Sequence, residues 1–229
     1  MTVQDQKDLV EAVAAWLRFE VLCKHDDFLS EDILAYPLSL FFANRRYSLE
    51  PERPYPNLKP PEGRGRRQAV DYAFLAPRTR QLTGFMELKF APDTKYLLGD
   101  VVRLWELAGD RYLLLATVRP LNNDYWQRVS KFLPMEVGVP RQFGEDEVPD
   151  LKKQHDEWLK LLRAPMSRRV RRKRQYKARL VALHKPPSPN DPDRATVALW
   201  QIFDWEKKRD DDEVSMQRVT EAPQATNAG

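Results

Sequence analysis

Two apolar runs separated by a short polar loop constrain the fold of this chain more than any other feature. The runs cover residues 70–75 (VDYAFL) and 83–90 (TGFMELKF), and the loop between them contains residues 78–80 (RTR). This pattern predicts a β-hairpin. Because side chains alternate between the two faces of a strand, Glu87 and Lys89 share one face of the second strand. The hairpin therefore presents an acid and a base side by side.

The length of the loop also predicts which residues face each other. With an odd-length loop at residues 78–80, Asp71 lies opposite Glu87, and paired residues on adjacent strands point to the same side of the sheet. Mg²⁺ takes oxygen ligands and often needs only one or two carboxylates. A bound metal activates water and polarises a phosphoryl oxygen, and Lys89 beside it stabilises phosphate charge or orients the water. The cluster predicts a Mg²⁺ site, in which Mn²⁺ can substitute, and the Leu88 carbonyl is a candidate third ligand.

A surface hairpin with a cross-strand ion pair is the alternative interpretation. The pattern acid–any residue–Lys carries little information alone, since it recurs at 5–7, 93–95, 150–152 and 206–208. The apolar context and the facing acid distinguish residues 87–89 from these. An ion pair explains the lysine well, but it explains less well an acid inside the first apolar run.

With Asp71 on one strand and Glu87-Leu88-Lys89 on the next, the chain resembles the PD-(D/E)xK nuclease superfamily, which has the restriction-endonuclease-like fold. The proline of that family's motif is replaced by Val70, a common departure. The resemblance implies a metal-dependent nuclease whose core spans about residues 5 to 118.

Two predicted helices add candidate site residues. Residues 5–24 have apolar residues at helical spacing, and the resemblance implies an acid on this first helix that reaches the metal. Glu20, at the edge of the apolar face, is the candidate; the alternative is a surface acid near Lys24. On a later helix, Asp100 and Arg103 are three residues apart, as in a helical ion pair, and Arg103 is a candidate phosphate contact.

The remaining core pattern predicts an α/β fold with a mixed central sheet flanked by helices. Residues 95–108 predict a helix, and the continuous apolar run at 111–118 is typical of a strand buried on both faces. Residues 33–42 fit a helix end or a first strand. Five prolines at 51–61 predict a loop rather than a helix or strand.

The C-terminal part of the chain is predicted to elaborate this core. We expect helices at 122–133 and 150–163 and an acidic loop at 136–150. Residues 176–184 and 195–205 alternate or run apolar, which predicts an antiparallel pair of strands.

Length and composition are typical of one medium domain with an appendage. The chain has 229 residues, of which 42% are hydrophobic, enough for a buried core. We predict a nuclease-like core over 1–135 and an elaboration over 136–206 that packs on the core or extends it. Charge rises and aromatic content falls over 207–229, which predicts a disordered tail.

Positive charge is concentrated in one stretch, although the formal net charge is only +4. Residues 163–179 contain nine Lys or Arg and no acid, a composition that attracts a polyanion and releases counterions on binding. The alternative is a solvated flank balanced by the acidic residues 145–150. The predicted nucleic-acid-binding residues are Arg66, Arg67, Arg168, Arg169, Arg171, Arg172, Lys173, Arg174 and Lys177.

Other chemistries find little support in the sequence. His25, His155 and His184 lack ligand spacing, and a single cysteine, Cys23, excludes both a thiolate zinc site and an internal disulfide. There is no Gly-rich phosphate loop. We expect a cytoplasmic protein, because neither a secretory signal nor a stretch of about 20 apolar residues is present.

The sequence thus predicts a metal-dependent nuclease with the catalytic residues Asp71, Glu87, Lys89 and Glu20. Its expected partner is nucleic acid, with DNA favoured over RNA, and a homodimer or a larger nucleic-acid-processing complex is compatible with the sequence. One alternative is a catalytically silent subunit with the same fold that binds nucleic acid or serves assembly. A second alternative is a purely structural protein-interaction domain.

Overall fold

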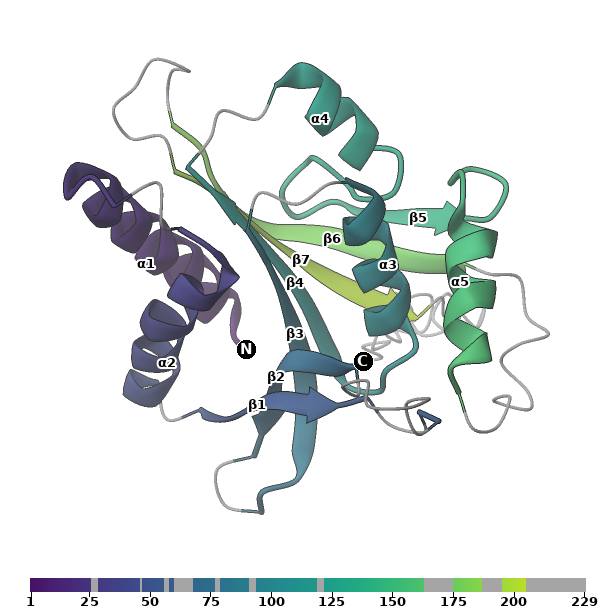
Figure 1. Cartoon of the computed structure of the whole chain (residues 1–229), viewed down its shortest axis with the longest axis horizontal. Coiled ribbons are helices and arrows are strands. Elements are labelled where there is room, and N and C mark those ends of the chain that lie inside the picture. The colour runs from purple at the N-terminus through teal and green to yellow at the C-terminus, as the bar shows by residue number, and fades with distance from the viewer. Residues whose placement is uncertain are drawn as a thin grey trace, which may run out of the picture.

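A seven-stranded mixed sheet with helices on both faces forms the protein in the computed structural model (Figure 1). The strand order is β1-β2-β3-β4-β7-β6-β5. Neighbouring strands are antiparallel except for β3 and β4, which are parallel. The structure describes residues 1–25, 29–45, 47–55, 58–59, 68–76, 79–90, 94–118, 122–162, 175–186 and 195–204.

The elements follow one another along the chain with helices and strands interleaved. The strands are β1 (Ser48–Pro54), β2 (Ala69–Leu75), β3 (Leu82–Phe90), β4 (Asp110–Thr117), β5 (Pro140–Gly144), β6 (Gln175–His184) and β7 (Thr196–Asp204). The helices are α1 (Val3–Leu22), α2 (Ala35–Asn44), α3 (Thr94–Trp105), α4 (Asn123–Val129) and α5 (Leu151–Lys160), with a 3₁₀ turn, η2 (Glu31–Leu34), before α2.

The predicted hairpin is confirmed as β2 and β3. Tyr72 pairs with Met86 and Ala73 pairs with Phe85. Continuation of this register by one residue puts Asp71 opposite residue 87, as predicted. The predicted reason, a loop confined to residues 78–80, was wrong: Ala76 and Gln81 still pair, and a β-bulge between Phe74 and Leu75 shifts the register by one residue.

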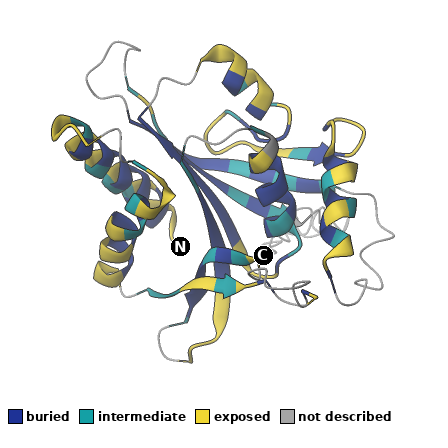
Figure 2. Cartoon of the chain, viewed as in Figure 1, coloured by how far each residue is buried: buried dark blue, intermediate teal, exposed yellow. Residues whose placement is uncertain are grey.

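The sheet separates two apolar cores. Strand β4 contributes to both, with Leu113 and Leu115 on the face covered by α3, α4 and α5, and with Tyr112 and Leu114 on the face covered by α1 and α2. This alternation confirms the predicted strand buried on both faces. In Figure 2 the central strands are buried, and the exposed residues follow the outer sides of the helices.

Two strands form where the sequence predicts loops. Strand β1 overlaps the start of the proline-rich region 51–61, and β5 lies within the acidic region 136–150. Both are edge strands. An edge strand tolerates proline because the missing N–H can face away from the neighbouring strand, and β1 accordingly accommodates Pro51 and Pro54. The loop prediction was wrong for these two segments because a short edge strand needs no apolar alternation.

The C-terminal strands extend the sheet that contains the hairpin. Strand β7 pairs with β4 on one side and with β6 on the other, both antiparallel. The region 33–42, which fitted a helix end or a strand, lies in η2 and α2. The predicted tail 207–229 lies outside the described residues. Within those residues, no helix is both long and apolar enough to cross a membrane.

The close approach of β3 to β4 predicts a strict requirement for glycine at position 84. A Cβ atom on Gly84 would lie 2.5 Å from the Asp110 carbonyl oxygen of the paired strand. We expect Gly84→Ala to lower the free energy of unfolding by about 1–3 kcal/mol through overpacking, measured by urea denaturation.

Gly99→Ala is the matched control. Position 99 lies in helix α3, where a Cβ atom would meet the end of the flexible Gln154 side chain at 3.3 Å. Because alanine exceeds glycine in helix propensity by about 1 kcal/mol, this variant should be neutral or more stable. Equal losses in both variants would contradict the proposed packing constraint at β3.

Candidate active site

The structure brings together the three residues on which the sequence prediction depends. Asp71 extends from β2, and Glu87 and Lys89 extend from β3. The Lys89 Nζ atom lies 4.0 Å from Asp71 Oδ2 and 4.0 Å from Glu87 Oε2. The surface ion pair described as the alternative does not fit this geometry, because Glu87 is only 3% exposed.

Two further acids approach the same ammonium. Glu31 Oε2 from η2 lies 3.3 Å from Lys89 Nζ, and Asp100 Oδ2 from α3 lies 3.8 Å from it. Four carboxylates from four elements thus surround Lys89. We call this group, formed by Glu31, Asp71, Glu87, Lys89 and Asp100, the Lys89 cluster.

The burial of Glu87 determines its protonation. Its Oε1 atom accepts a hydrogen bond from the Tyr55 hydroxyl. Burial, followed by the nearby Asp71 charge, raises the pKa of Glu87 to about 8, while Tyr55 and Lys89 oppose the shift. Burial likewise raises the pKa of Tyr55 well above its usual value, so the phenol remains a donor. At neutral pH Glu87 therefore retains its proton unless a further cation lies beside it.

Asp71 has both a backbone contact and access to solvent. The backbone N–H of Leu88 donates a hydrogen bond of 2.6 Å to Asp71 Oδ2. The regular pairing of β2 with β3 ends at Tyr72 and Met86, so the carboxylate takes the place of a strand partner beyond that point. The side chain of Asp71 is 32% exposed, which leaves it accessible to a ligand.

The Leu88 side chain points away from the cluster. It packs in the core beneath α1 and α2 together with Met86, as alternation on a strand requires. Only the backbone of Leu88 therefore lies beside Asp71, and its N–H makes that contact.

Asp100 is the acid that the sequence analysis missed as a site residue. It is fully buried, and its Oδ1 atom accepts a hydrogen bond from the Arg103 guanidinium, which confirms the predicted helical ion pair. Its position between Leu97 and Val101 on the apolar stripe of α3 was the available signal. Glu31, on a short 3₁₀ turn, carried no comparable signal.

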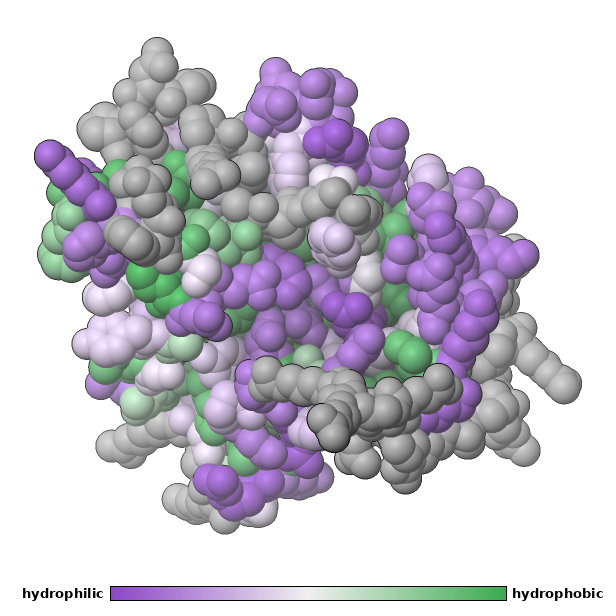
Figure 3. Space-filling view, in the orientation of Figure 1, coloured by the Kyte–Doolittle hydropathy of each residue, from purple (hydrophilic) through white to green (hydrophobic). Residues whose placement is uncertain are grey.

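The Lys89 cluster opens into a cleft of about 700 Å³ between η2, the end of β3, α3 and α5. Its lining includes Lys89, Asp100, Arg103 and, from α5, Lys153 and Glu157. On the face shown in Figure 3, hydrophilic residues cover α5 and the centre of the molecule. Both charge signs line this cleft, so it can contact an anionic ligand and a cation at once.

Glu20 lies elsewhere. It is buried, and its Oε2 atom lies 2.9 Å from His25 Nδ1. Helix α1 packs on the sheet face that carries Met86 and Leu88, whereas Glu87 and Lys89 belong to the opposite face. The structure does not bring Glu20 to the Lys89 cluster, and its catalytic role stays a prediction without structural support.

Most of the predicted nucleic-acid contacts cannot be placed. Lys177 is half-buried in β6, where it pairs with Gln142 and Phe203. The other eight, Arg66, Arg67, Arg168, Arg169, Arg171, Arg172, Lys173 and Arg174, lie outside the described residues.

The donor set suits a hard cation with few protein ligands. Among the described residues, no group of three or more His, Cys, Asp or Glu side chains has the geometry to hold a metal ion by itself. The available donors are carboxylate oxygens, and the Oδ2 atom of Asp100 is buried without a hydrogen-bond partner among those residues. Mg²⁺ commonly keeps several waters and binds through one or two carboxylates plus substrate phosphate. The cluster thus offers carboxylate oxygens of the kind that Mg²⁺ takes, but among the described residues it supplies no complete ligand set.

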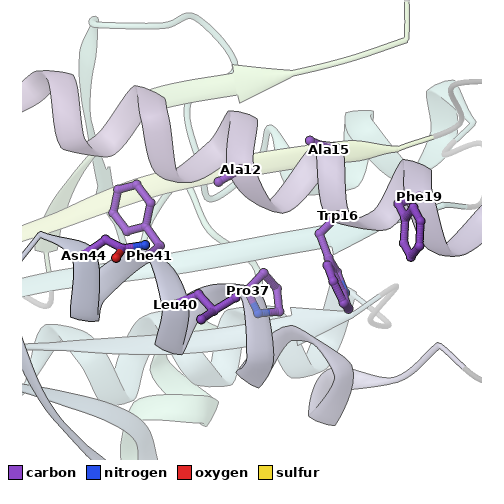
Figure 4. A pocket seen from close by; sticks show the side chains of 8 residues that line it. All are labelled: Ala12, Ala15, Trp16, Phe19, Pro37, Leu40, Phe41 and Asn44. Carbon is purple, nitrogen blue, oxygen red and sulfur yellow. The ribbon is translucent and has the colours of Figure 1, made fainter.

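A second concave surface has a different character. Helices α1 and α2 enclose an apolar groove of about 500 Å³, into which Trp16 and Leu40 project (Figure 4). The residues that line it are Ala12, Ala15, Trp16, Phe19, Pro37, Leu40, Phe41 and Asn44. None of these has an acidic or basic side chain, and Asn44 is the one polar amide among them, so the candidate chemistry belongs to the Lys89 cluster.

Comparisons with family models, with curated proteins and with solved structures found no match to this chain.

The raised pKa of Glu87 predicts a pH-dependent stability. A carboxyl whose pKa is about 8 in the folded state and about 4.5 when unfolded releases its proton on unfolding between these values, so its contribution is lost as pH rises through 8. Relative to Glu87→Gln, the native protein should lose a few kcal/mol of unfolding free energy between pH 4.5 and 8.5, at about 1.4 kcal/mol per unit of pKa difference.

Urea denaturation across this pH range measures the effect. Glu147→Gln, at an exposed position, is the matched control and should follow the native profile. Parallel pH profiles for the native protein and Glu87→Gln would mean that Glu87 is ionised in the fold.

Proposed function

We propose that the protein is a metal-dependent nuclease that hydrolyses phosphodiester bonds, with DNA as the favoured substrate. The observation that carries this proposal is the convergence of Asp71, Glu87 and Lys89 from two paired strands, beside a cleft that Lys89 lines. An acid on each strand and a lysine two residues after the second acid is the combination that the sequence resemblance implies.

The arrangement of elements also supports the proposal. Helix α1 precedes three antiparallel strands, β1 to β3, and helix α3 then leads to β4, which is parallel to β3. This agrees with the order of helix, hairpin, helix and buried strand expected from the sequence. The assignment to a restriction-endonuclease-like fold remains part of the proposal.

Each residue has a distinct task in the proposed reaction. Asp71 and Glu87 would hold Mg²⁺ or Mn²⁺ together with the Leu88 carbonyl, and the metal would supply an activated water and polarise the phosphoryl group. Lys89 keeps its ammonium within 4.0 Å of both carboxylates, where it can steady the phosphate or orient the water. Arg103, whose side chain is 28% exposed in the cleft, is positioned for a second phosphate contact.

A catalytically silent subunit that binds nucleic acid is the second candidate function. The internal pairing of the site favours it, because each of the three residues already has a partner in the protein. The Tyr55 hydroxyl donates to Glu87 and the Leu88 N–H donates to Asp71. The Lys89 ammonium donates to Glu31. A homodimer or a larger nucleic-acid-processing complex in the cytoplasm is compatible with either function and is part of the proposal.

Cleavage assays with site variants test the enzyme. We expect the purified protein to cut plasmid, linear duplex or single-stranded DNA with Mg²⁺ or Mn²⁺, and EDTA should stop the reaction. Asp71→Asn and Lys89→Met should each lower the rate by about 100-fold or more, because each removes a group that contacts the reacting phosphate or its metal. In calorimetry with Mn²⁺, Asp71→Asn should weaken binding, while Lys89→Met should leave it in place.

Asp124→Asn and Lys131→Met, both at exposed positions, are matched controls and should cut at the native rate. Native rates in both site variants would refute the site. Nucleic-acid binding without cleavage under any metal condition would establish the silent subunit instead.

The basic stretch predicts a salt-dependent affinity. Neutralising Arg171, Arg172, Lys173 and Arg174 together should weaken duplex binding and reduce the log–log slope of affinity against salt by about 0.9 for each phosphate that the variant no longer neutralises. Fluorescence anisotropy with labelled duplex at several salt concentrations measures this slope. A matched control removes four exposed cations from helices and turns: Lys7, Lys24, Arg128 and Lys131. An equal change of slope in the control would mean that the effect is one of net charge alone.

A further inference from the structure

Asp100 is the most deeply buried charged group of the Lys89 cluster. It is 0% exposed and lies on the apolar stripe of α3, where an aliphatic residue would be the ordinary choice. Burying a carboxylate is costly unless it is paired. The Arg103 guanidinium pairs with Oδ1, but Oδ2 has no hydrogen-bond partner among the described residues and lies 3.8 Å from Lys89 Nζ. Half of this buried carboxylate is therefore directed at the lysine.

The three other acids around Lys89 attract it less strongly. Glu31 is closest, but its side chain is 44% exposed, and ion pairs in contact with water contribute little. Glu87 Oε2 lies 4.0 Å from the ammonium, farther than Asp100 Oδ2 at 3.8 Å, and its Oε1 atom already accepts the Tyr55 hydroxyl. Asp71 is partly exposed and already accepts the Leu88 N–H. The attraction between two charges grows as the surroundings become less polar, so fully buried Asp100 has the strongest hold on the ammonium.

Arg103 fixes the direction of this hold. It lies three residues after Asp100 on the same helix, so the two side chains are neighbours on the helix surface and form an ion pair there. Helix α3 packs against β3, which carries Lys89. The flexible Lys89 side chain is therefore held by a short side chain on a helix, that of Asp100, and not by the longer and more exposed side chain of Glu31.

We infer that Asp100, oriented by Arg103, is a positioning residue that holds the Lys89 ammonium beside Asp71 and Glu87. The effect of this positioning on catalysis rests on the proposed nuclease function. The orientation of Lys89 by Asp100 does not depend on that function. A catalytic group that is held in place before substrate binds loses less entropy in the reaction, and small misplacements are costly. Without Asp100, the ammonium turns to Glu31 and solvent.

The side-chain NH₃⁺ resonance of Lys89 tests the inference directly. In ¹H–¹⁵N spectra of lysine-labelled protein, an NH₃⁺ group gives a signal only when an ion pair protects it from rapid exchange with water. Lys89→Arg assigns the signal. We expect it in the native protein and in Asp100→Glu, and we expect its loss in Asp100→Asn. Glu31→Gln is the matched control and should retain it, because the contact with Glu31 is the exposed one.

Asp100→Leu is a second variant, for the case that Asp100→Asn does not fold. Position 100 lies on an apolar stripe, and the Arg103 side chain, which is 28% exposed, can turn to solvent when its partner is removed, so we expect this variant to fold. This variant should also lose the Lys89 signal. Retention of the signal in Asp100→Asn or Asp100→Leu, or its loss in Glu31→Gln, would overturn the inference.

Kinetics separate this inference from the proposed function. If the protein is a nuclease, Asp100→Asn should lower kcat by about tenfold or more with little change in KM, since a misplaced catalytic group acts on the transition state more than on binding. Asp100→Glu should recover most of this loss. A native kcat in Asp100→Asn would overturn the catalytic role of the positioning. Absence of cleavage in the native protein would refute the nuclease, and the NMR result would still decide how Lys89 is held.

Discussion

The parallel pairing of β3 with β4 is the constraint on which the site depends. Two parallel neighbours cannot be joined by a tight turn, so the chain must cross over between them, and it does so through α3. The crossover brings Asp100 and Arg103 to the end of β3, beside Lys89. An antiparallel continuation after β3 would have left the hairpin acids without a helix to cover them.

Charge balance explains why so many acids can share this space. The Lys89 cluster and Arg103 together contain four carboxyl groups and two cations, an arrangement that would be strongly repulsive if every acid were ionised. Proton retention by Glu87 removes one negative charge, and the hydrogen bond from Tyr55 satisfies the same group. In the proposed enzyme a divalent cation would replace that proton, since a nearby positive charge favours the ionised carboxylate.

The hairpin itself could be predicted because it depends on a local rule, the alternation of side chains on two apolar runs. The register of Asp71 opposite residue 87 agrees with the prediction for a different reason, because a β-bulge between Phe74 and Leu75 shifts the pairing by one residue. The contacts of Glu31 and Asp100 depend on where the crossover returns, which no local pattern encodes. Glu20 shows the converse limit. Helical spacing identifies the edge of an apolar face, but it does not say which face of the sheet the helix covers, and α1 covers the face away from Glu87.

The internal pairing that favours a silent subunit is also compatible with an enzyme. Buried charges without partners would destabilise any fold, whether or not it performs catalysis. A site that binds a cation and a phosphate must therefore balance its own charges before either arrives. Proton retention does this for Glu87, and the Lys89 ammonium does it for Asp71. The two functions differ in whether a metal or a substrate can displace these protein partners from Glu87, Asp71 and Lys89. Asp71 is partly exposed, and the carboxylate nearest to Lys89 is that of solvent-accessible Glu31. The contacts most readily exchanged are thus those that face the cleft, where a substrate would enter.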